Sequence, residues 1–196
     1  MVDIVSVLIL IFDLILSIWN AYVSGYNIGL IRKSGGGGFG EIVSYAGLCL
    51  AFAGAVYVLI VILSFVGYIL GYVSNDAVDT AFAYDFLVFG ILIIIFGLLV
   101  TIQSIIAASK KGGWSILGAF YNVFAEVLDI SNYVSAFSDT RHMISGNDKD
   151  NENVVAIIFI AVLIGFFIVF AAYKHGYNKA MGIVGRNAQR AYYATS

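Results

Sequence analysis

The sequence contains a long uncharged stretch from Ile42 to Val73, in which no Asp, Glu, Lys, Arg or His occurs. A helix crosses a hydrocarbon core of about 30 Å with about 20 mostly apolar residues, so this stretch must tilt or extend beyond the bilayer. The composition of the whole chain also indicates a membrane protein, because 61% of its residues are hydrophobic and 11% are charged. Soluble domains have about 25% charged residues. We therefore expect an all-α, polytopic integral membrane bundle, and we exclude a soluble domain, a disordered chain and a nucleic-acid-binding protein.

The apolar pattern predicts a single transmembrane domain over residues 1–196 with five spans, at about 4–24, 42–73, 82–109, 114–137 and 154–173. The span 82–109 carries Asp85 near its start. The stretch 114–137 is the least certain to insert, because it carries Asn122, Glu126, Asp129 and Asn132. The alternative is four spans with this stretch as an interfacial helix, although such helices usually carry Lys and Arg on their polar face.

The distribution of basic residues favours five spans over four. Five spans place eight of the ten Lys and Arg residues in one compartment, whereas four spans divide them six against four. Because Lys and Arg in short loops set orientation, we expect the N-terminus outside and the C-terminus in the cytoplasm. The expected connections are a Gly-rich cytoplasmic loop at 34–40, a polar outer loop at 138–153 and a basic, aromatic C-terminal tail at 174–196.

Polar side chains recur at helical spacing in two of the expected spans, and they form one stripe on each. Residues three or four apart lie on one helix face, so we expect stripe to face stripe inside the bundle. No Lys or Arg lies at the same depth, and a charge there is costly. At least one of the acids should therefore be protonated at neutral pH, or be neutralised by a cation or a file of water. The cluster is either a set of interhelical hydrogen bonds or an ion path, and its members are Asp13, Ser17, Asn20, Asn122, Glu126 and Asp129.

A short pattern, A-Y-x-x-G-Y-N, occurs twice, once at the end of the first span and once at the end of the last. Tyrosine is a typical anchor at a membrane interface, and glycine lets helices approach closely. The two copies are either similar interfacial anchors, or two helix ends that pack as a pair or against neighbouring subunits and form one recognition surface. The residues concerned are Tyr22, Gly25, Tyr26 and Asn27, and Tyr173, Gly176, Tyr177 and Asn178.

Glycines also recur at four or seven residues inside the spans, which indicates faces for close helix packing. Such faces can serve within one chain or between subunits of an oligomer. The pairs are Gly47 with Gly54, Gly67 with Gly71, and Gly90 with Gly97.

The segment from Gly40 to Leu48 reads G-E-I-V-S-Y-A-G-L. It resembles the G-[DE]-x-x-S-Y-x-R-L helix in the membrane half of the rotary ATPase subunit a/I family, and this resemblance would imply work in proton translocation. The arginine that the family requires is replaced here by Gly47, and the match covers a few residues only, so we assign no family.

The side chains needed for common enzyme chemistry are scarce. Cys49 is the only cysteine, His142 and His175 have no partners at zinc-binding spacing, and there is no G-x-S-x-G nucleophile motif. We expect no enzyme, no metal and no cofactor. The first hypothesis is a structural or accessory subunit that packs into an oligomeric assembly, as a homo-oligomer or with other membrane subunits, in the lipid bilayer. The alternative is a small oligomeric channel or carrier for protons or cations.

Overall fold

The computed structural model describes residues 4–144 and 151–182. Within these ranges the chain forms five helices and no strand, which confirms the all-α bundle. A helix rises about 1.5 Å per residue, so each helix exceeds the length needed to cross a hydrocarbon core. The helices are α1 (Ile4–Lys33), α2 (Phe39–Ile69), α3 (Asn75–Lys111), α4 (Trp114–Ile144) and α5 (Asn151–Ala180).

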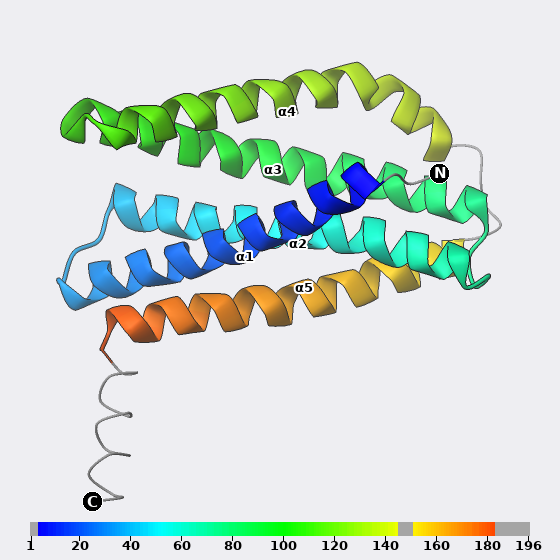
Figure 1. The fold of residues 1–196 in the computed structure, drawn as a ribbon, viewed down its shortest axis with the longest axis horizontal. Coiled ribbons are helices and arrows are strands. Elements are labelled where there is room, and N and C mark those ends of the chain that lie inside the picture. Colours follow the sequence, from blue (N-terminus) through cyan, green and yellow to red (C-terminus); the bar gives the residue numbers. More distant parts are fainter. Residues whose placement is uncertain (1–3, 145–150, 183–196) are drawn as a thin grey trace, which may run out of the picture.

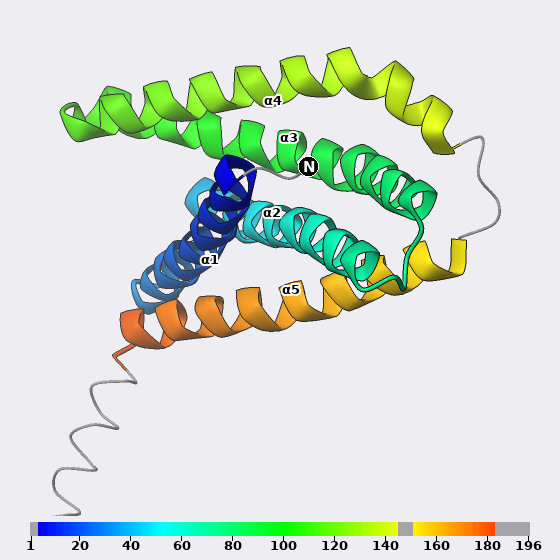
Figure 2. The same ribbon diagram turned by 45° about the vertical axis from the view of Figure 1, so that its right-hand side comes forward.

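Helix α2 is the centre of the bundle and packs against α1, α3 and α5. Successive helices run in opposite directions along one common length, so that α1 and α5 are parallel and end at the same end of the bundle (Figure 1). A turned view places the α3–α4 hairpin on one side, α5 on the opposite side, and α1 and α2 between them (Figure 2). Helix α4 packs on α3 alone among the described helices.

Small residues allow α2, α3 and α5 to pack closely in the core. Val56 and Ile60 of α2 are fully buried and lie with Ala81 of α3 and Ala161 of α5 in one cluster. Large apolar side chains instead point outward over much of the surface, as at Phe167, which is 66% exposed. A soluble protein rarely exposes such continuous apolar surface, so this distribution suits a bundle surrounded by lipid.

Four of the helices in the described ranges are long and apolar enough to cross a membrane, over Leu8–Lys33, Phe39–Ile69, Asn75–Lys110 and Glu152–Ala180. The chain is therefore a multi-pass membrane protein. Helix α4 is not among these four, and it is the helix that carries Glu126 and Asp129.

The turn between α2 and α3 differs from the expected spans, because α2 ends at Ile69 and α3 begins at Asn75. Gly71 has a positive φ of 75°, and the amides of Gly71 and Tyr72 donate to the carbonyl oxygens of Tyr68 and Gly67. These two bonds form a Schellman motif, in which glycine takes the left-handed position after the helix. The expected helix-packing pair of Gly67 and Gly71 is therefore wrong, since Gly71 lies outside the helix.

The other helix bounds also extend past the expected spans. Helix α1 continues to Lys33 and α5 continues to Ala180, whereas α2 already begins at Phe39, inside the expected Gly-rich loop. The expected outer loop 138–153 is mostly helical, because α4 reaches Ile144 and α5 begins at Asn151. Its residues 145–150, and the part of the expected tail at 183–196, lie outside the described residues.

Candidate functional site

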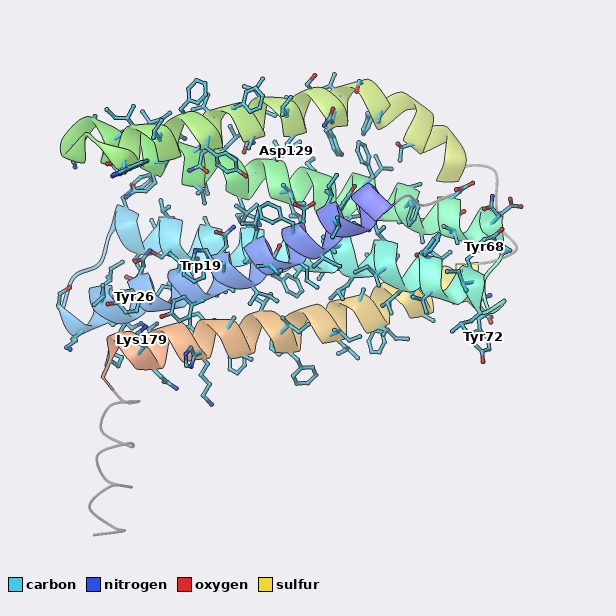
Figure 3. The ribbon with its side chains drawn as sticks, viewed as in Figure 1. Trp19, Tyr26, Tyr68, Tyr72, Asp129 and Lys179 are labelled. Atoms are coloured by element: carbon cyan, nitrogen blue, oxygen red, sulfur yellow. The ribbon has the colours of Figure 1, made fainter. Side chains whose placement is uncertain are left out.

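The polar stripes of α1 and α4 line one cavity of about 390 Å³, which α2 and α3 complete. Helix α1 contributes Asp13, Ser17 and Asn20, and α4 contributes Asn122, Glu126 and Asp129. The structure thus brings together all six residues that the sequence pattern grouped. Asp129 lies near the middle of the length of the bundle (Figure 3).

The two stripes face each other across this cavity and are not in direct contact. Among the described residues, α1 and α4 do not pack on each other. Asp13 and Asp129 nevertheless line the same cavity. Stripe therefore faces stripe as expected, but across the cavity, because α4 is held by α3 and does not pack on α1 among the described residues.

Glu126 is the most enclosed acid of this cavity, with 6% of its surface exposed. Its carboxylate lies against the backbone of α3 at Gly97, where an added Cβ atom would collide with a carboxylate oxygen. The other carboxylate oxygen, Oε1, has no hydrogen-bond partner within the described part of the chain. Buried polar groups are nearly always paired with protein or water, so this oxygen is a position for a proton, a water molecule or a cation.

Contacts with α3 fix the position of α4. The Tyr133 hydroxyl donates to the carbonyl oxygen of Leu87 at 3.2 Å, and its ring stacks on Phe86 with the centroids 5.1 Å apart. An added Cβ atom at Gly90 would lie 3.1 Å from the Tyr133 ring. Gly90 and Gly97, which the sequence grouped as one packing face, therefore make room for side chains of α4.

The pair Gly47 and Gly54 has a corresponding role between α1 and α2. An added Cβ atom would lie 2.7 Å from the Ser24 hydroxyl at Gly47 and 2.8 Å from the Ser17 hydroxyl at Gly54. Ser17 and Ser24 are both buried. Part of the polar stripe of α1 thus packs on α2, while Asp13 and Asn20 line the cavity.

The two copies of the A-Y-x-x-G-Y-N pattern pack directly on each other, where α1 and α5 run in parallel. An added Cβ atom at Gly25 would collide with the backbone carbonyl of Tyr173, and one at Gly176 would collide with that of Tyr22. The contact is reciprocal, since equivalent positions of the two copies exchange partners. Of the two alternatives from the sequence, the structure favours the packed pair within one chain.

The aromatic residues of the two copies form a belt at this end of the bundle. The Tyr22 ring lies 5.8 Å from the His175 ring and 5.8 Å from the Lys179 ammonium, and Tyr173 stacks on Tyr177. Tyr26 and Lys179 lie at this end, and Tyr68 and Tyr72 lie at the other end (Figure 3). Aromatic side chains at both ends of an apolar bundle are typical of membrane interfaces.

Asn27 and Asn178 of the pattern differ in their surroundings, because Asn27 is exposed and Asn178 is partly buried. Two further members of the contact, Gly29 and Ala180, lie outside the repeated pattern. An added Cβ atom at Gly29 would lie 2.7 Å from that of Ala180. The sequence signal for these two residues is a small residue at every fourth position. The small residues are Ala21, Gly25 and Gly29 on α1, and Ala172, Gly176 and Ala180 on α5.

Asp85 is the acid that the sequence analysis undervalued. It has 1% of its surface exposed, and neither carboxylate oxygen has a hydrogen-bond partner within the described residues. The signal was helical spacing, because Ala77, Ala81 and Phe89 occupy the same face of α3 at steps of four residues and are also buried.

The described residues contain no group of three or more His, Cys, Asp and Glu side chains arranged to hold a metal ion. No protein-family model, curated protein or solved structure matches the chain.

Proposed function

We propose that this chain is a small channel or carrier for protons or cations, working through the acid-lined cavity between α1 and the α3–α4 hairpin. The observation that carries the proposal is Glu126, a nearly buried carboxylate with an oxygen that no described residue partners. It shares the cavity with Asp13 and Asp129. Such an oxygen is open to a proton, a water molecule or a cation, and an ion path requires a group that can exchange its partner.

The proposal includes five spans, with the N-terminus outside and the C-terminus in the cytoplasm. Helix α4 runs antiparallel beside α3 along most of its length (Figure 1), and its 31 residues extend about 46 Å at the usual helical rise. Arg32, Lys110, Lys174 and Lys179 lie near the ends of α1, α3 and α5 that share one side of the bundle. An excess of Lys and Arg on one side supports a cytoplasmic location for that side.

Protons are the first candidate for the transported ion. The described residues do not form a three-ligand metal site, and no Lys or Arg lines the cavity to pair with its acids. Neighbouring carboxyl groups without a cation share protons and titrate together. Such a group can accept and release a proton without the coordination shell that a divalent cation needs.

The test is proton flux into liposomes that contain the purified protein and a trapped pH-sensitive dye, under an imposed potential. We expect the wild type to conduct protons, and Glu126→Gln and Asp13→Asn to lower the rate about tenfold or more, since a neutral amide cannot carry the proton. The matched control is Glu152→Gln, which removes an exposed acid outside the cavity and should leave the rate unchanged. No flux by the wild type in either a proton or a sodium or potassium gradient would refute the proposal.

The second candidate is a structural or accessory subunit of a membrane assembly. It is supported by α4, which packs on α3 alone among the described helices and exposes Phe120, Val127 and Val134. The glycine pairs and the repeated pattern give it less support, because they are used inside one chain. Mass measurement in mild detergent tests it, since a strict monomer would contradict both a homo-oligomer and a stable assembly.

A further inference from the structure

A second and larger cavity, of about 970 Å³, is lined by α1, α2 and α3 and by Thr140 of α4. Tyr57 and Phe86 line both cavities and therefore separate them. The walls of the larger one are mainly apolar and aromatic. Its aromatic side chains come from α2 and α3, and they are Tyr57, Phe65, Phe82 and Phe86.

Asp85 lines this cavity and is the one fully buried acid among its described lining residues. Both of its carboxylate oxygens lack a partner within the described part of the chain. Among the residues whose side chains the structure describes, no Lys or Arg lines the cavity. Asp79 also lines it, but Asp79 is exposed and lies close to the start of α3, where it can attract cations from that end of the bundle.

The size and chemistry of the cavity select among the groups that could pair with Asp85. A metal ion needs several ligands, and the described residues contain no group of three or more His, Cys, Asp and Glu side chains that could hold one. A volume of about 970 Å³ is within the range of pockets for organic molecules. Aromatic faces attract a desolvated organic cation through their quadrupoles, and apolar walls accept its hydrocarbon groups.

We propose that this cavity binds a lipophilic organic cation, whose positive charge pairs with Asp85 and whose apolar groups lie against the aromatic walls. The proposal does not depend on proton flux through the first cavity, because the two cavities use different acids. The proposal gives the carboxylate of Asp85 a role in binding. An apolar cavity of the same volume that bound a neutral molecule would need no such acid.

The test is equilibrium binding of tetraphenylphosphonium to the purified full-length protein in detergent, with tetraphenylborate as an anion of the same size and shape. We expect saturable binding of the cation, and a rise in the unfolding temperature of the wild type with its concentration. Asp85→Asn should weaken the binding by about tenfold or more, because it removes the paired charge and keeps the shape. Glu152→Gln, at an exposed acid outside both cavities, is the matched control and should bind as the wild type does.

Two results would overturn the proposal. One is equal binding of tetraphenylphosphonium and tetraphenylborate to the wild type, which would indicate an apolar void that takes up any lipid-like molecule. The other is unchanged affinity of Asp85→Asn for the cation. The comparison of the two ions uses the wild type alone, so it decides the matter even if the Asp85→Asn variant does not fold.

Discussion

The two halves of α1 contact the rest of the molecule in opposite ways. The C-terminal half lies backbone to backbone on α5, where Gly25 and Gly176 leave no space for a Cβ atom. The N-terminal half carries Asp13 and faces a polar cavity, across which α4 is not in contact with it. One helix thus combines a tightly packed segment with a segment that borders an open, acidic space.

This difference separates the residues that hold the bundle together from those available for function. In lipid, helices associate through close van der Waals packing because burial from water no longer drives them together. The α1–α5 contact has this property, whereas the acids around the cavity add little packing and carry a cost for burial. We therefore expect substitutions in the two regions to affect different measurements.

The largest loss of stability should follow Gly25→Leu or Gly176→Leu. Each side chain would collide with the backbone of the opposite helix, which cannot move without separating α1 from α5. Overpacking costs about 1–3 kcal/mol or more, and we expect at least the upper end of this range in the free energy of unfolding, measured in detergent. Gly118→Leu is the control, because nothing lies within 4 Å of an added Cβ atom there. Equal losses at Gly25 and Gly118 would contradict the packed pair.

A smaller loss should follow Gly90→Ala, at the contact between α3 and α4. Its Cβ atom would lie 3.1 Å from the Tyr133 ring, and a side chain can shift where a backbone cannot. We expect a loss of about 1 kcal/mol in the free energy of unfolding. A loss as large as that of Gly25→Leu would mean that the α3–α4 contact is as rigid as the α1–α5 contact.

Tyr133→Phe should cost about 1 kcal/mol or less, because it removes one hydrogen bond to the Leu87 carbonyl and keeps the ring that stacks on Phe86. The measurement is the same unfolding assay. Tyr121→Phe is a matched control, since Tyr121 is 59% exposed on the same helix. If both variants lose the same stability, the bond to Leu87 does not hold α4.

Glu126→Gln should have the smallest effect on stability, close to zero, although it should lower proton flux about tenfold or more. A buried carboxylate with an unpartnered oxygen contributes little to folding, and its neutral isostere removes the cost of burying charge. We expect an unchanged free energy of unfolding together with a loss of proton flux. A strong loss of stability would instead assign Glu126 to the packing of α4 on α3.

The sequence predicts the helical class and the polar faces well, because both follow from local periodicity. It grouped Asp13 with Glu126 and Asp129 correctly in space, but it could not tell that α4 stands away from α1, which depends on how α3 positions α4. The pair Gly67 and Gly71 was misjudged because glycine spacing alone does not distinguish a packing face from a helix end. The sequence places Asp85 near the start of a span, which says little about its burial. The informative property is the face of α3 on which Asp85 lies, because the other residues of that face are buried.

The account depends most on α4 crossing the membrane, since this places Glu126 inside the bilayer and sets the direction of α5. The direct measurement is labelling by a membrane-impermeant maleimide, in intact and in opened vesicles, of single cysteines placed at Lys110 and Glu152 in a Cys49→Ser background. These exposed positions precede α4 and follow it. We predict labelling of the two positions from opposite sides of the membrane. Labelling of both positions from the same side would contradict the account.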